Sequence, residues 1–581
     1  MSFALPSVAV PARGLLVVAG KVLVTSFGQN NAQIVYVKNN SLKAWSIDDI
    51  SPYWNANGFV ELIKDGATAD FVRFGNSTVM PTTSGAWNGP NVPALPSADT
   101  EYGKAIVRPM PGGGIGANRR SAADWVLVNF ATPAGSNDIA PGVIDSDVDG
   151  IPDSAKLPGG TYGGLDLYAM GARAGQRDIF MQIDYMKEPV GRIEPMLKPR
   201  KEALQKVVDA FANSPTAGKP YALHIDVGPL YSSSFSPADF NLGGGKEVPF
   251  HRCLAVPSLW PQYQPPPDDC ATLFDYKSIS FDVRRRLAFH YAIFGNSQQE
   301  DGSEDSSGIA ELYGNDFIVT MGNMNTADGT SSYPADTESQ KQFLINIQAA
   351  TLMHEFGHNL GLGHGGDNFV DNYKPNYISI MNYLHQLTGI GASLTDQTAA
   401  DRYMLHTQKS TSLQKFTACD LPGGNPVNVT TITNSPCTTD FKIDYSNGKG
   451  LPLDEANIDE ALNVGRGSTN GGYADWNHNG VQDPALSYQE WLNPGPNMPL
   501  PASPRILRDF NDWDNLMLPF ARHLNGSNNG IGSQRRTTSV SVNPMSPRPH
   551  MLIIESVPTF WHQPIAVEKN RHKTESTGTP R

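Results

Sequence analysis

The stretch that decides the fold reads His354-Glu355-Phe-Gly-His358-Asn-Leu-Gly361-Leu-Gly-His364. Histidines four residues apart on a helix project from one face, at a separation that one tetrahedral zinc ion bridges. Gly361 suits the end of that helix, where positive φ turns the chain and brings His364 back as a third ligand. Three ligands leave an open position, which is typical of a catalytic zinc site. The sequence therefore predicts zinc on the three histidines, with Glu355 beside it as the base.

The residues before this stretch predict that it closes a long buried helix. Thr337 and Gln340 have the spacing of a capping box. Apolar residues then recur from Phe343 to about Leu360. The alternative, a helix with incidental histidines, requires five fixed residues to coincide, a chance on the order of 10⁻⁵.

Further upstream, apolar runs alternate with one amphipathic helical pattern. We expect buried strands at residues 178–186, 221–227, 289–294 and 316–321, and a helix that begins at Pro199. A strand, helix and strand in this order predict a parallel pair. The centre of the chain is therefore expected to be an α/β layer that leads into the metal-binding helix.

Downstream of the histidines, Ser379-Ile-Met381-Asn-Tyr383 completes a recognisable pattern. Together with His354–His364, this turn resembles the metzincin clan of zinc peptidases over roughly residues 173–395. The resemblance implies an α/β (α+β) catalytic core with a central active-site helix between an upper and a lower subdomain. It also implies that Met381 forms an apolar floor under the metal. The chain shows no clear astacin N-terminal or serralysin repeat signature, so the subfamily stays open.

Tyr383 matches the tyrosine with which astacin-like and serralysin-like members stabilise the reaction's oxyanion; the alternative is an ordinary core tyrosine. In such a site Glu355 accepts a proton from the attacking water, whose pKa falls to about 7 on zinc, and passes it to the leaving amine. The expected activity is endopeptidase cleavage of a protein or peptide substrate. Two alternatives stay open: a binding or adhesion protein that keeps the zinc site, and a zinc amidase acting on non-protein amides.

Two acidic loops have the alternating oxygen ligands and the glycine turn of calcium sites. The first predicts calcium on Asp145, Asp147, Asp149, Ile151 and Asp153. Lys156 stands where a complete EF-hand carries glutamate, so an acidic turn without calcium is the alternative. The second, less charged loop predicts calcium on Asp475, Asn477, Asn479, Val481 and Asp483, with the same alternative.

The four cysteines, Cys253, Cys270, Cys419 and Cys437, cluster as two sequential pairs. Two local disulfides are expected, and these indicate an extracellular, oxidising location; four free thiols are the alternative. The N-terminal residues show no clear secretory signal, so the start of the chain is interpreted as incomplete or as a strand pair.

Length and composition limit the number of domains and the kinds of partner. A length of 581 residues predicts several domains, and a net charge of -13 argues against a nucleic-acid partner. No apolar run is long enough to span a membrane. The texture predicts five segments: a β-rich accessory or pro-domain (1–140), an acidic calcium-type loop and linker (141–172), the catalytic domain (173–395), a loop-rich C-terminal subdomain (396–530) and a basic tail expected to be flexible (531–581). Within that tail, the apolar run 551–554 is suited to docking as a strand.

Overall fold

The computed structural model describes only part of the chain. The described residues are 5, 9–10, 15–20, 32–37, 56–95, 104–109, 120–192, 196–216, 218, 220–255, 269–303, 306–312, 314–322, 337–368, 371–390, 436–459, 483, 503–518 and 551–554. Within them the architecture is mixed α/β, as predicted, and the metzincin-like core stays an expectation.

One central sheet organises the fold, in the strand order β17-β13-β14-β12-β7-β8, with β9 also paired to β7. Its strands are β7 (Arg177–Met186), β8 (Tyr221–Asp226), β9 (Glu247–Val248), β12 (Phe289–Gly295), β13 (Gly308–Leu312), β14 (Asp316–Thr320) and β17 (Met551–Ile554). The strands from β14 to β8 pair in parallel, whereas β13 is antiparallel to both β14 and β17. The four strands predicted from apolar runs are confirmed, and β13 is an element that the sequence did not indicate.

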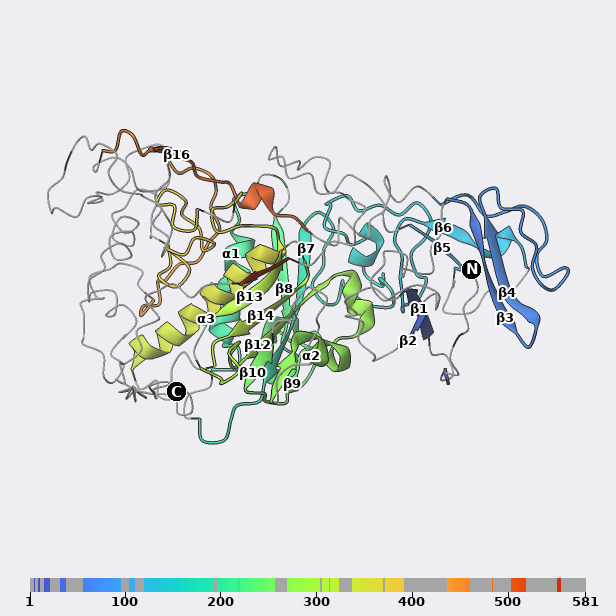
Figure 1. The fold of residues 1–581 in the computed structure, drawn as a ribbon, viewed down its shortest axis with the longest axis horizontal. Helices are drawn as coiled ribbons and strands as arrows, with labels where there is room; N and C mark the ends of the chain where they lie inside the picture. Colours follow the sequence, from blue (N-terminus) through green and yellow to red (C-terminus); the bar gives the residue numbers. More distant parts are fainter. Residues whose placement is uncertain are drawn as a thin grey trace, which may run out of the picture.

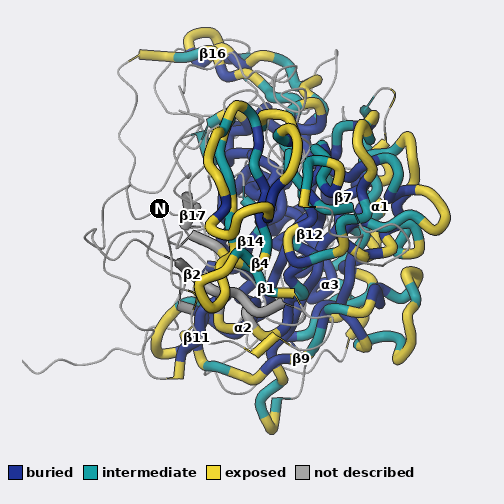
Figure 2. The backbone as a smooth tube through the Cα atoms, turned by 90° about the vertical axis from the view of Figure 1, so that its right-hand side faces the viewer, coloured by how far each residue is buried: buried dark blue, intermediate teal, exposed yellow. Residues whose placement is uncertain are grey.

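Both faces of the sheet are buried, which explains why its strands are nearly continuous apolar runs. Ile179, Met181 and Ile183 of β7 pack with α1 (Lys201–Ala212) and α3 (Glu338–Asn359). Phe180 points to the other face, where it joins residues such as Phe130 and Ile151. The buried residues gather around β7, β12 and α3 (Figure 2).

The long helix α3 forms as predicted. Thr337 is its N-cap, and the reciprocal bonds of a capping box with Gln340 are present. From Phe343 onward every α3 residue is buried, so the helix runs through the core rather than along the surface (Figure 1).

Segments far along the chain complete this core. Phe441, Ile443, Tyr445, Trp513 and Leu516 belong to the same hydrophobic cluster as α1 and α3. These residues lie beyond 395, so parts of the expected C-terminal subdomain pack directly around the metal-binding helix.

The remaining elements are short. They are β1 (Leu15–Gly20), β2 (Ala32–Val37), β3 (Gly58–Lys64), β4 (Ala67–Phe74), β5 (Ala105–Val107), β6 (Val126–Val128), β10 (Cys253–Ala255), β11 (Cys270–Thr272), α2 (Leu273–Ser280), β15 (Leu453–Asp454) and β16 (Ile506–Leu507). The β3–β4 hairpin lies at the far end of the molecule from α3 (Figure 1). Among the described residues, no helix is long and apolar enough to cross a membrane.

Candidate metal centre

The three predicted ligands come together at the C-terminal end of α3. His354, His358 and His364 offer nitrogen atoms that all lie within 4.8 Å of one another. Their ring centroids are 4.9 Å apart for His354 and His358, 5.4 Å for His354 and His364, and 4.9 Å for His358 and His364. All three side chains are buried, so this group could hold a metal ion.

Hydrogen bonds to the backbone set the tautomers of the two helical histidines. Nδ1 of His354 lies 2.7 Å from the carbonyl oxygen of Ile380, and Nδ1 of His358 lies 2.7 Å from that of Leu362. A carbonyl oxygen only accepts, so each Nδ1 carries the proton and each Nε2 keeps its lone pair. Metal-binding histidines are oriented in this way, and the donor set therefore fits a metal ion.

Gly361 has the predicted role at the end of the helix. Its φ is +89°. Its N–H donates to the His358 carbonyl at 2.9 Å, and the Leu362 N–H donates to the Gly357 carbonyl at 2.9 Å. These two bonds form a Schellman motif, which satisfies the last helical carbonyls and turns the chain toward His364. The Lys374 ammonium, which donates to the Gly365 carbonyl at 2.8 Å, fastens the loop that carries this third histidine.

Met381 lies against the helix between the two helical ligands. A Cβ atom on Gly357 would collide with the sulfur of Met381 and would also crowd the hydroxyl of Tyr445. That hydroxyl donates to the Met353 carbonyl at 2.7 Å. Gly357 is therefore required for the close approach of the 379–383 turn, a role that the sequence analysis missed although the residue lies inside the histidine motif.

Tyr383 packs directly on the histidines. Its ring centroid is 4.2 Å from that of His364 and 6.1 Å from that of His354, and the residue is buried. The position is compatible with the predicted role in stabilising an oxyanion, and that role stays a prediction.

The Glu355 side chain is fully buried next to β13, the strand that the sequence did not indicate. A Cβ atom on Gly308, the first residue of β13, would collide with the Glu355 carboxylate. The glutamate therefore lies between the metal-binding helix and the beginning of β13. Asn359 extends this connection, since its amide donates to the carbonyls of Glu311 at 2.8 Å and Asp316 at 3.0 Å.

A buried carboxylate from the distant C-terminal part supports the 379–383 turn. Asp512 accepts hydrogen bonds from the hydroxyl of Ser379 at 2.6 Å, from Tyr377 at 2.8 and 2.9 Å, and from the Ser446 N–H at 2.9 Å. Burial raises the pKa of Asp512 to about 7, against the lowering by these donors. More than a hundred residues separate Asp512 from Ser379, and no spacing in the sequence connects them.

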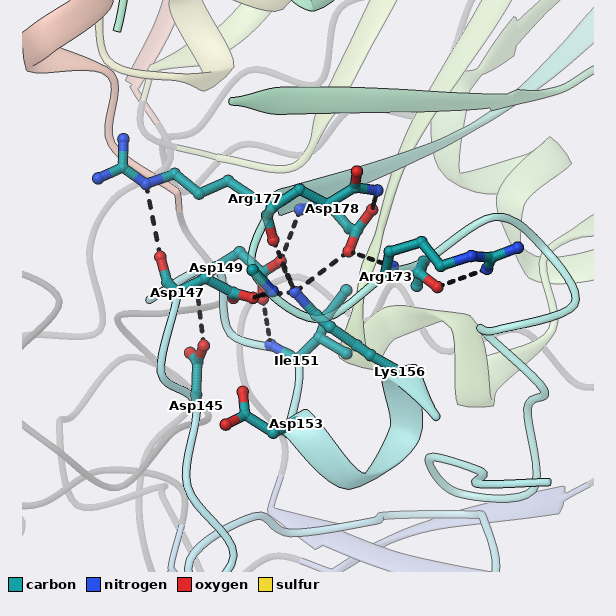
Figure 3. Close-up of polar contacts among 12 residues, drawn as sticks. Asp145, Asp147, Asp149, Ile151, Asp153, Lys156, Arg173, Arg177 and Asp178 are labelled. Carbon is teal, nitrogen blue, oxygen red and sulfur yellow. Dashed lines mark hydrogen bonds and ion pairs between the residues drawn. The ribbon is translucent and has the colours of Figure 1, made fainter. Parts of the chain in front are cut away.

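The first acidic loop forms, but a lysine lies among its carboxylates (Figure 3). Oxygens of Asp145, Asp147 and Asp149 lie within 4.8 Å of one another, as a calcium loop requires. The buried ammonium of Lys156 donates to Asp147 at 2.9 Å and to Asp149 at 2.5 Å. It also lies 3.1 Å from Asp178, a carboxylate of β7 that was not predicted.

The other predicted ligands of this loop have local partners. Asp153 accepts a hydrogen bond from the Ser146 N–H at 2.9 Å, and the Ile151 N–H donates to Asp149 at 2.9 Å. Burial raises the pKa of Asp145 to about 6. Burial alone would lower the pKa of Lys156, but the charges of Asp149, Asp178 and Asp147 raise it. The shared cation in this structure is therefore the ammonium, and calcium binding stays a prediction.

The second acidic loop falls outside the described residues except for Asp483. Asp475, Asn477, Asn479 and Val481 therefore stay predictions. Cys253 and Cys270 form the first predicted disulfide, between β10 and β11. Cys437 is also disulfide-bonded, while Cys419 lies outside the described residues.

Comparison with known proteins adds no relative to this geometry. Searches of protein-family models, of curated proteins and of solved structures found no match to the chain. The functional argument therefore depends on the site itself.

Proposed function

We propose that this protein is a zinc-dependent endopeptidase. The observation that carries the proposal is the buried group of three imidazoles, two of them with Nδ1 bonded to backbone carbonyls, next to a buried glutamate on the same helix. Imidazole ligands suit zinc among the common metals, and three of them leave room for a reacting oxygen.

The metal, when bound to His354, His358 and His364, supplies a Lewis acid that polarises a carbonyl and lowers the pKa of water. The chain's own residues supply the proton transfer and the positioning. The Glu355 carboxylate accepts the proton of the attacking water and returns it to the leaving amine. Tyr383, which packs on His364, offers a phenol donor to the developing oxyanion.

The disulfide between Cys253 and Cys270 indicates an oxidising environment. We propose on this basis that the enzyme works outside the cell on protein or peptide substrates. The histidine group by itself does not distinguish peptides from other amides, so the proposed substrate class depends on the resemblance of the 354–364 and 379–383 motifs to metzincins.

A digestion experiment tests the proposal. The purified chain is incubated with an unfolded protein, with and without a zinc chelator, and its metal content is measured in parallel. We expect cleavage that stops on chelation and returns with zinc. His358→Ala should lose both metal and cleavage, whereas His251→Ala, which removes a histidine bonded to Tyr276, should keep both. A metal-loaded chain that leaves unfolded proteins intact would contradict the proposal.

A further inference from the structure

The outer edge of β13 is covered by a strand from the far C-terminal part of the chain. β13 pairs on one side with β14 and on the other with β17, antiparallel in both cases. In the second pairing Ile309 faces Ile554, and Leu312 faces Met551. The 519–550 stretch between β17 and the preceding described segment lies outside the described residues.

The strand β13 itself runs along the metal-binding half of α3. Gly308 at the start of β13 contacts the Glu355 carboxylate, and the Glu311 carbonyl near its end accepts the amide of Asn359 at 2.8 Å. The residues from 355 to 359 thus follow β13 along its length. β17 lies one strand further out, beyond β13 at the edge of the sheet.

A sheet edge next to a hydrolytic centre is a docking place for an extended chain. Its free N–H and C=O groups pair with any peptide in the β conformation, whatever the peptide's sequence. An edge accommodates one strand at a time. A substrate that pairs with β13 next to Glu355 therefore needs the same backbone groups that β17 occupies.

The sequence of β17 suits this use. Met551-Leu-Ile-Ile554 is apolar and prone to form a strand, and prolines at 547, 549 and 558 limit how far the pairing extends. Because β17 belongs to the same chain, its pairing with β13 is intramolecular and does not depend on the protein concentration. An intramolecular segment can hold a weak strand pairing that a dilute free peptide would not maintain.

We propose that Met551–Ile554 is a built-in occupant of the edge at which extended peptides dock, so that the C-terminal segment competes with substrate. The competition with substrate rests on the proposed endopeptidase function, whereas occupation of the edge does not. Displacement or removal of β17 opens the edge of β13 beside Glu355 without altering the metal ligands.

The test uses the full-length chain with Leu552→Pro and Ile553→Pro together, since proline cannot continue a strand pairing. The matched control carries Ile565→Pro and Ala566→Pro, two prolines in the same tail outside β17. Hydrogen exchange of the β13 amides is measured in all three proteins. Binding of a labelled synthetic peptide with the sequence of residues 548–556 is measured by fluorescence anisotropy.

We expect faster exchange at β13 and tighter peptide binding in the β17 variant than in the wild type and the control. If the edge is free about one-tenth of the time in the wild type, peptide affinity rises about tenfold in the variant. For unfolded-protein cleavage, KM should fall by the same factor while kcat is unchanged.

The remaining outcomes decide the matter separately for the two proposals. Unchanged exchange at β13, or equal peptide binding in wild type and variant, overturns the inference. A variant that melts at a lower temperature without gaining peptide affinity shows that β17 is only a structural strand, and also overturns it. If none of the three proteins cleaves the unfolded substrate but exchange and peptide binding change as expected, the endopeptidase proposal is wrong. The inference that β17 occupies the edge of β13 is then still supported.

Discussion

Nδ1 of His354 donates a hydrogen bond of 2.7 Å to the carbonyl oxygen of Ile380. This bond joins the metal-binding helix to the turn that carries Met381, and the Ile380 N–H in turn donates to the Asp444 carbonyl at 2.8 Å. The orientation of the first metal ligand therefore depends on a turn that is itself fixed by a C-terminal segment.

Gly357→Ala tests the close approach of helix and turn. In an ordinary helix interior this change stabilises by about 0.5–1 kcal/mol. Here the new methyl group would collide with the Met381 sulfur, so we expect a loss of about 1–3 kcal/mol instead. Denaturant unfolding of the two proteins measures the sign directly.

A second variant separates the collision from a general effect on the helix. Met381→Ala removes the sulfur, and Gly357→Ala should then cost less in that background than in the wild type. Equal costs in both backgrounds would show that the two side chains do not interact.

The stability that Asp512 contributes through the 379–383 turn depends on pH. Its folded pKa, about 7, lies above its unfolded value near 3.8, so the folded state holds the proton more tightly. Stability from this group is therefore fully present below about pH 4 and is lost as the pH rises through about 7. Between pH 5 and 7 the loss amounts to about 2–3 kcal/mol.

The comparison with Asp512→Asn isolates this contribution, because asparagine does not titrate. The free energy of unfolding of the wild type minus that of the variant should fall as the pH rises from about 4 through the folded pKa of about 7, and be constant above about pH 8. A difference that does not vary with pH would show that Asp512 is ionised throughout.

Lys156→Met tests the cation inside the first acidic loop. The change leaves buried Asp147 and Asp149 without their ammonium partner, and we expect a loss of about 3–5 kcal/mol in unfolding experiments. Lys198→Met is the matched control, because the Lys198–Glu247 pair is 36% and 39% exposed and should contribute under about 1 kcal/mol.

If calcium rather than Lys156 is the cation of the first acidic loop, the opposite results are expected. If Lys156 supplies the cation, a calcium-selective chelator should leave the melting temperature of the wild type unchanged. A melting temperature that falls on chelation, together with a near-neutral Lys156→Met, would show that calcium displaces the ammonium and would confirm the sequence prediction.

Local patterns predicted the parts of this fold that local forces determine. The capping box at Thr337, the positive φ of Gly361 and the buried parallel strands follow from residues close together in the chain. The same holds for the meeting of His354 and His358, which needs only one turn of helix.

Contacts between distant segments were not predictable in this way. Asp512 accepts a hydrogen bond from Ser379, and β17 pairs with β13, although no sequence pattern relates these distant segments. β13 escaped notice because Gly308-Ile-Ala-Glu-Leu312 is short and its alternation weak. Lys156 was noted only as a departure from a calcium loop, because the geometry that makes an ammonium a replacement cation appears only in the folded chain.

The central claim, that Glu355 is the proton-transferring group of a zinc endopeptidase, is tested most directly by Glu355→Gln. The substitution nearly preserves volume and leaves the three histidines in place, so we expect zinc content equal to that of the wild type. Cleavage of an unfolded protein by the purified variant should fall by about 10²–10⁴-fold, the usual contribution of a general acid–base group. A zinc-loaded variant that cleaves at nearly the wild-type rate would contradict the account.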